Sequence, residues 1–285
     1  MAVVAEDLGR LSGARHVSVS DDRLGRDVLV TADLHPGAAD AALKRLDGLS
    51  IASDDITLVR LETVGPAATA EPLVVVWADV LGQARVQARA PARYLVLMAV
   101  AGVIAALAVV NESPVLIVGA MAISPDLLPI TAACTGLVLR RRRLVQRSLA
   151  TLIGGLVVAS TLALAVTLFL EAFDLLPAGF ALGEIPAAQT HVNATTVLVA
   201  AAAGVAGMLA VETRASAAVG VGISVTTIPA TAFVGVAIGI GEIGRSWSAL
   251  GVLGVNIAMM LLGGSVALAT QRLRASRVAN PPPPS

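Results

Sequence analysis

The sequence predicts an α-helical polytopic membrane protein with a small α/β domain at its N-terminus. The 285 residues are 56% hydrophobic and only 14% charged, whereas soluble globular proteins carry about 25% charged residues. Six apolar stretches each approach the roughly 20 residues that a helix needs to cross the hydrocarbon. The polar residues gather in the first 93 positions, at 140–147 and at the C-terminus.

Residues 1–65 are expected to form a small, partial ferredoxin-like domain in the cytoplasm. Helical spacing and strand alternation predict the order α-β-β-α-β, which is most of a split β-α-β unit. The segments are VVAEDLGRL, ARHVSVS, RDVLVTADL, PGAADAALKRL and DITLVRLETV. No phosphate loop, metal cluster or catalytic pair is visible here, so the domain either senses a ligand or has a structural, oligomerising role.

Residues 66–93 are expected to form a linker and a connecting helix. The stretch EPLVVVWADVLGQARVQARA begins apolar and ends with Arg85 and Arg89. It predicts either an amphipathic helix along the cytoplasmic interface, with Trp77 among the headgroups, or a soluble stalk helix.

The membrane part is predicted to contain two sets of three spans. The first triplet covers 94–172, an extracytoplasmic loop covers 173–193, and the second triplet covers 194–270. A basic tail, 271–285, ends in a proline run and is expected to be disordered. The individual spans are predicted at 94–111, 114–139, 147–172, 194–212, 216–241 and 247–270.

The distribution of arginine predicts the orientation of the spans. Arginines cluster before the first span, after the second and after the sixth, whereas the alternate loops hold almost none. The positive-inside rule then places both termini in the cytoplasm, which agrees with an even number of crossings. The arginines concerned are Arg85, Arg89, Arg93, Arg140, Arg141, Arg142, Arg143, Arg147, Arg214, Arg272, Arg274 and Arg277.

The two triplets align when the chain is displaced by about 100 positions. AISPDLLPITA at 122–132 falls on GISVTTIPATA at 222–232, in the middle span of each triplet. Because a triplet crosses an odd number of times, the second must be inverted relative to the first. Inverted repeats with interrupted helices at matching positions are typical of secondary transporters.

Prolines predict a break in both middle helices. Pro125, Pro129 and Pro229 lack an N–H group, so carbonyls one turn earlier lose their helical partners. Lipid cannot satisfy those carbonyls, which must therefore face protein or a wet cavity. With neighbouring hydroxyls they could coordinate a small cation or a polar solute. The alternative is a proline kink healed by Ser/Thr hydroxyls and tight packing.

Asp126 is the strongest single candidate for a functional residue, because ionisable side chains inside a membrane are rare and tend to be functional. It aligns with Thr226 and could bind a cation, relay a proton, or hydrogen-bond Thr226 or Thr227. Asn256 is predicted to be interhelical glue or a pore-lining group. The candidate binding residues are Ser124, Pro125, Asp126, Pro129, Ser224, Thr226, Thr227, Pro229 and Asn256.

Two motifs carry a resemblance to a known family. GAMAISPDLLPI with its arginine-rich turn, and GVGISVTTIPATAFVGVAIGIGE with LGVNIAMM downstream, resemble the bacterial and archaeal "uncharacterised hydrophobic domain" family, domain of unknown function 389. The similarity covers most of the chain. That family usually has Leu-Met-Gly where this chain has Asp126-Leu127-Leu128, and often two adjacent prolines near Pro229. The resemblance implies a plasma (inner) membrane protein and assigns no substrate and no role to Asp126.

Together these observations predict a secondary transporter or channel for a small solute or ion in a bacterial or archaeal plasma membrane. It is expected to be a homo-oligomer, with the N-terminal domain in a regulatory or oligomerising role. The alternatives are a membrane-anchored sensor or scaffold and a lipid-binding or lipid-moving protein. An enzyme is not expected, because there is no nucleophile–base pair, His cluster or nucleotide loop. Neither a cofactor nor a nucleic-acid partner is expected.

Overall fold

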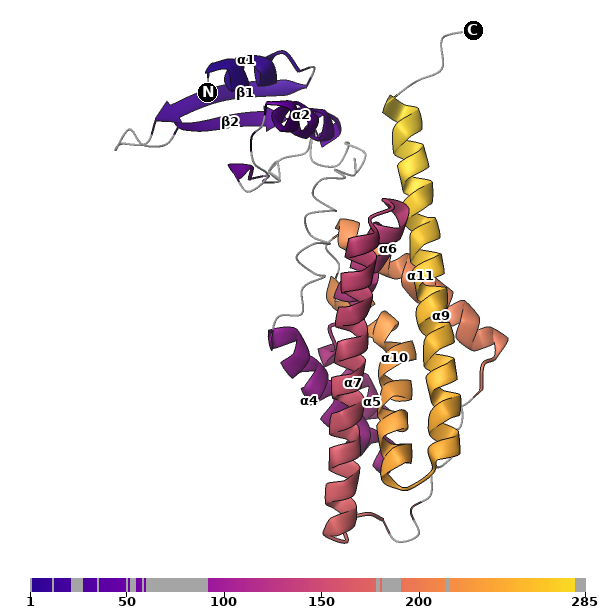
Figure 1. Ribbon diagram of the computed structural model, residues 1–285. Helices are drawn as coiled ribbons and strands as arrows, with labels where there is room; N and C mark the ends of the chain where they lie inside the picture. The colour runs from indigo at the N-terminus through magenta and orange to yellow at the C-terminus, as the bar shows by residue number, and fades with distance from the viewer. Residues whose placement is uncertain are drawn as a thin grey trace. The chain divides into compact units, whose positions relative to one another are not determined.

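The computed structural model divides into two compact units (Figure 1). The N-terminal unit comprises Met1–Gly82 with Leu273–Ser285, and the membrane unit comprises Gln83–Arg272. The residues described are 2–11, 13–21, 28–34, 36–49, 51, 55–57, 59, 92–177, 180, 191–213 and 216–279.

The N-terminal unit contains a β-hairpin flanked by two helices. Its elements are α1 (Ala2–Gly9), β1 (Ala14–Asp21), β2 (Val28–Leu34) and α2 (Pro36–Gly48). The strands pair antiparallel, with an irregularity between Arg15 and Ser18, and Leu8, Ala39 and Ala42 are buried. The predicted order of helix, two strands and helix is therefore confirmed.

The third predicted strand, at 55–64, is not formed by its described residues. Residues 55–57 and 59 are outside any strand, and the described sheet has two strands. The rest of that segment, and the connecting helix predicted within 66–93 up to residue 91, lie outside the described residues.

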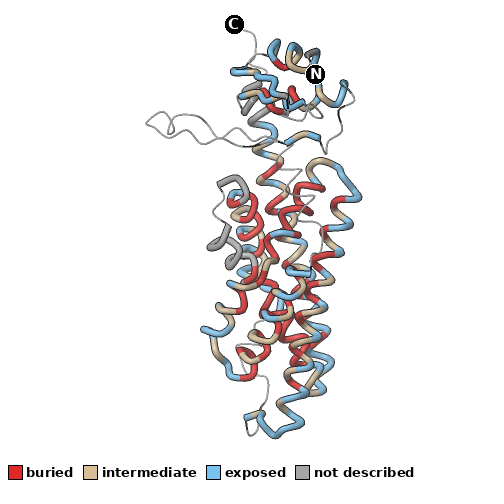
Figure 2. The backbone as a smooth tube through the Cα atoms, turned by 90° about the vertical axis from the view of Figure 1, so that its left-hand side faces the viewer, coloured by how far each residue is buried: buried red, intermediate tan, exposed pale blue. Residues whose placement is uncertain are grey.

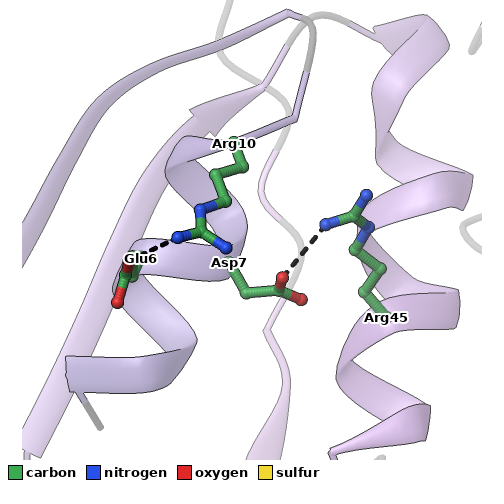
Figure 3. A network of polar contacts seen from close by, with 4 residues as sticks. All are labelled: Glu6, Asp7, Arg10 and Arg45. Atoms are coloured by element: carbon green, nitrogen blue, oxygen red, sulfur yellow. Dashed lines mark hydrogen bonds and ion pairs between the residues drawn. The ribbon is translucent and has the colours of Figure 1, made fainter.

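One ion pair joins the two helices of the N-terminal unit (Figure 3). Arg45 of α2 donates to Asp7 of α1 at 3.0 Å. A second pair is local: Arg10, directly after α1, donates to Glu6 of α1 at 2.7 Å. Exposed pairs of this kind contribute about 0–1 kcal/mol each, so the Arg45–Asp7 pair orients α1 against α2 more than it stabilises the unit.

The helices of the membrane unit coincide with the six predicted spans. They are α4 (Ala92–Val110), α5 (Pro114–Ile123), α6 (Leu127–Val138), α7 (Arg142–Ala172), α9 (Ala194–Thr213), α10 (Ser216–Gly239) and α11 (Ile243–Ala279). Among the described residues, three helices are able by length and composition to cross a membrane: α4, α7 and the stretch Ile243–Leu273 of α11. The pair α5 and α6, bent by 56°, is a fourth if it forms one broken span rather than a re-entrant loop. The described apolar stretches of the other two, Ala194–Ala210 and Thr226–Gly239, are shorter.

The first predicted helix break is confirmed and the second is wrong. The chain leaves helical geometry between Ile123 and Leu127, whereas α10 continues as an α-helix through Pro229. Pro229 removes one N–H group, and nearby carbonyls receive other donors. Asn256 donates to the Thr226 carbonyl at 2.8 Å, and the Thr231 hydroxyl donates to the Thr227 carbonyl at 2.7 Å. Helix α10 thus continues through its one proline, whereas two prolines four residues apart interrupt the first middle helix.

Glycines allow the helices of each triplet to cross closely. A Cβ atom at Gly102 of α4 would overlap the backbone of Ala159 in α7. A Cβ atom at Gly204 of α9 would overlap the backbone of Met260 in α11. Small residues that let backbones approach are the usual basis of helix packing in membranes. The outer helices of both triplets therefore pack on each other through a glycine.

The turns that follow the two middle helices have the same hydrogen bonds. Leu139, Arg140 and Arg141 donate to the carbonyls of Thr135, Leu137 and Gly136, and Ile240, Gly241 and Glu242 repeat this pattern 101 positions later. The central residue of each turn has a positive φ, 53° at Arg140 and 81° at Gly241. Both turns thus end their helix through one left-handed residue.

Helices α7 and α11 run in opposite directions. Figure 1 shows α7 descending from the α6 turn and α11 ascending from the end of α10. In Figure 2, buried and exposed segments alternate along these helices, as expected for helices that bury one side. Apolar side chains such as Ile153 and Leu262 lie on the exposed sides.

We predict that Gly102→Ala destabilises the membrane unit by about 1–3 kcal/mol, because the new methyl group overpacks a backbone contact. Gly251→Ala is the matched control, since a Cβ atom there meets nothing within 4 Å. The control is expected to be neutral or to stabilise by up to about 1 kcal/mol. Thermal unfolding of the purified protein in detergent measures both, and equal melting temperatures would contradict the predicted crossing.

Candidate functional site

The break between α5 and α6 leaves backbone carbonyls without helical donors. Ser124 is the C-cap of α5, with ψ at 126°, and its N–H donates to the Ala120 carbonyl at 3.1 Å. The next residue, Pro125, has no N–H. Within the described part of the chain, no backbone N–H donates to the carbonyls of residues 121–123. These three oxygens form the electronegative end of α5.

Asp126 occupies the N-cap position, directly before α6. Its side chain makes no capping hydrogen bond and is 0% exposed. Instead, its Oδ2 atom accepts a hydrogen bond of 2.6 Å from the Thr227 hydroxyl of α10. This bond crosses between the middle helices of the two triplets. The other carboxyl oxygen, Oδ1, has no partner among the described residues.

Further buried side chains that carry oxygen atoms lie on α4, on α10 and at the break. Ser224 lies one turn before Thr227 and on the same face of α10; it is 0% exposed, and its Oγ has no partner in the described part of the protein. The Tyr94 hydroxyl of α4 is likewise buried without a described partner, and it interacts electrostatically with Asp126. Ser124 donates to Met98 Sδ at 3.7 Å. We call Tyr94, Ser124, Asp126, Ser224 and Thr227 the break cluster.

The carboxyl group of Asp126 has no cationic partner among the described residues. The three described ion pairs all lie elsewhere. The described residues also contain no group of three His, Cys, Asp or Glu side chains that could hold a metal ion. A buried carboxylate without a counter-charge carries a large desolvation penalty. Neutralisation of the carboxylate by a proton or by a cation would remove this penalty.

A second polar contact lies on a different face of α10. Asn256 donates to the Thr226 carbonyl, and the Thr226 hydroxyl donates to Met260 Sδ at 3.7 Å. Consecutive helical residues are rotated by about 100°, so Thr227 reaches Asp126 while Thr226 reaches α11. Asn256 thus serves as interhelical glue, with its Oδ1 free of partners in the described region.

The structure therefore divides the candidates that the sequence predicts. It brings Ser124, Asp126, Ser224 and Thr227 into the break cluster, with Pro125 in the interruption and Pro129 buried in the first turns of α6. It places Thr226 and Asn256 at the α10–α11 contact, and Pro229 inside a continuous α10. Sequence reasoning missed Tyr94, the single tyrosine of the chain, because a tyrosine at the start of a span is typical of an interfacial anchor.

The hydrogen bond at the site does not follow the alignment of the sequence. The prolines align at an offset of 100, which pairs Asp126 with Thr226. The hydrogen bond joins Asp126 to Thr227, 101 positions later. Of the two threonine partners that the sequence offers for Asp126, the structure therefore selects Thr227.

Fold and site define a helical membrane protein with an uncompensated, buried carboxyl group at a broken helix. Residues 121–262 match the family model described as "Domain of unknown function (DUF389)", and the chain belongs to this family. The matched range contains the break, α6 and α10, and it leaves out the N-terminal unit, α4 and most of α5. No curated protein and no solved structure matches the chain.

We predict that Thr227→Val lowers the free energy of unfolding by about 1–3 kcal/mol, because a buried carboxyl oxygen loses its donor. Thr135→Val is the matched control: its buried hydroxyl donates to the Thr131 carbonyl of its own helix, which the backbone also bonds. In an Asp126→Leu background, Thr227→Val is expected to lose most of its effect. Thermal or denaturant unfolding measures the two single variants and the double variant. If the losses of Thr227→Val and Asp126→Leu simply add in the double variant, the direct bond is contradicted.

Proposed function

We propose that the protein is a membrane transporter or channel for a small solute or ion, with the break cluster as its binding site. One observation carries the proposal: a fully buried carboxyl group with a free oxygen lies on an interrupted helix. Interrupted helices place backbone and side-chain oxygens inside the membrane, where transporters bind their ions and solutes. The alternative, a proline kink stabilised by hydroxyl groups and tight packing, accounts for α10. It gives no role to the oxygens of Asp126 and Ser224 that have no described partner.

An inverted repeat is part of this proposal. Its support is the opposite direction of α7 and α11 (Figure 1), the recurring turn bonds, and an exchange of contacts between triplets. Cys134 of α6 bonds the Leu261 carbonyl of α11 at 3.7 Å, and Gly235 of α10 packs on the Ser160 carbonyl of α7. Each residue of the second contact is 101 positions from its counterpart in the first. Such an exchange is what a pseudo-two-fold axis through the Asp126–Thr227 bond produces.

The remaining features of the proposal follow from charge and composition. We place the protein in the plasma membrane of a bacterium or archaeon, with six crossings and both termini in the cytoplasm. Support comes from the exposed arginines 140–143 at the α6–α7 turn, which the positive-inside rule assigns to the cytoplasm. The proposal includes a homo-oligomer and no enzymatic activity. No contact among the described residues favours the sensor, scaffold or lipid-moving alternatives.

We predict that the starts of α7 and α11 face opposite sides of the membrane. Arg142 and Ile243 are both exposed, and they occupy equivalent positions 101 residues apart. In a Cys134→Ala background, Arg142→Cys is expected to react with a membrane-impermeant maleimide only from the cytoplasmic side. Ile243→Cys is expected to react only from outside. Labelling of both from the same side would rule out the inversion.

We predict that the reconstituted protein moves ions or small solutes across liposomes and that Asp126→Asn lowers the rate at least tenfold. Asparagine keeps the shape and the hydrogen bond to Thr227 but removes the charge. Flux is measured with a potential-sensitive dye for ions, and with labelled amino acids, organic acids and sugars. Thr167→Val, a buried hydroxyl loss in α7, controls for folding. Equal rates for wild type and Asp126→Asn would exclude the site.

A further inference from the structure

We propose that the break cluster binds one monovalent hard cation of the sodium type, between Asp126, the end of α5 and the hydroxyls of α10. The proposed function supplies the reason for such a site, as the place where an ion or coupled solute is carried. The oxygen atoms available as ligands, and the single negative charge among them, determine which ion fits.

The available ligand atoms are all oxygens. Asp126 contributes Oδ1, Ser224 contributes Oγ, and the three carbonyls of residues 121–123 end α5. Oxygen ligands select hard cations such as those of the alkali and alkaline-earth metals. The negative end of a helix dipole also favours a cation. The described sulfur atoms nearby are engaged, since Cys134 donates to Leu261 and Met98 accepts from Ser124.

The charge of the site selects a monovalent ion. Asp126 is the one acidic side chain among the buried residues of the described chain. Glu112, Glu171 and Asp174 are exposed and lie at or just after the ends of α4 and α7. One carboxylate neutralises one positive charge, whereas a divalent ion would leave an uncompensated charge in a buried place. Calcium and magnesium sites normally recruit additional carboxylates or waters.

The hydrogen-bond pattern favours a metal cation over a proton. Thr227 uses its hydrogen to hold Oδ2 of Asp126, which leaves Oδ1 of Asp126 and Oγ of Ser224 without described partners. A proton on Oδ1 would donate one hydrogen bond, either to Ser224 or to a single α5 carbonyl. It would leave the other acceptors without a partner. A cation accepts several of these lone pairs at once, so it accounts for the whole set.

The ligands of this cation come from both triplets. Asp126 and the α5 carbonyls belong to the first, and Ser224 and Thr227 belong to the second. Occupancy therefore ties the two middle helices together beside the Asp126–Thr227 bond. An ion in this position stabilises the folded protein and opposes separation of the triplets.

The test is the thermal unfolding of the purified full chain in detergent at fixed pH. NaCl is titrated against choline chloride at constant ionic strength. Wild type is expected to show a saturable rise in melting temperature with sodium. Asp126→Asn is expected to lose this rise. Ser224→Ala and Thr227→Val are expected to move the sodium midpoint at least tenfold upward, and Thr135→Val is expected to keep the wild-type response.

Three results would overturn the cation site. They are an equal rise with choline, a melting temperature that responds to pH but not to sodium, and a full sodium response in Ser224→Ala and Asp126→Asn. If Asp126→Asn does not fold, the sodium response of Ser224→Ala by itself tests the cation site. Sodium binding without flux would support this site and reject transport; Asp126-dependent flux without a sodium effect would support transport and reject the cation.

Discussion

The structure depends on one constraint: hydrocarbon supplies no hydrogen bonds, so an interrupted helix and a buried carboxyl group must find their partners inside the protein. The bond from Thr227 to Asp126 meets this constraint at the most demanding point. It joins the two middle helices and orients the carboxyl group. The oxygens that it leaves without described partners define the chemistry of the site.

The break can exist because the surrounding helices are packed backbone to backbone. Gly102 lies against Ala159 in the first triplet, and Gly204 lies against Met260 in the second. Cys134 of α6 donates to the Leu261 carbonyl of α11, and Gly235 of α10 packs against the Ser160 carbonyl of α7. These contacts use small residues and weak hydrogen bonds, as expected where lipid tails are as apolar as the side chains. These contacts hold the helices around the buried polar residues of the break.

The two middle helices have different roles despite their common pattern. The first has two prolines and a carboxyl group, and it opens into a bend. The second has one proline, keeps its helix, and presents Ser224 and Thr227 to the bend. Asn256 and Thr231 donate to the carbonyls of Thr226 and Thr227, within one turn of Pro229. One triplet thus supplies charge and free carbonyls, and the other supplies hydroxyls.

The sequence by itself determined the helices, the α5–α6 break and the candidate Asp126, because hydropathy, proline chemistry and the rarity of buried acids are local signals. Only the tertiary structure decided that α10 stays continuous, since a single proline is compatible with a break or with a kink. It also showed that the Thr226 carbonyl accepts from Asn256, thirty residues away. It also decided that Thr227 rather than Thr226 meets Asp126, because helix rotation separates adjacent residues by about 100°. Tyr94 likewise joined the site through packing alone, because no local pattern marks which side of α4 faces the break.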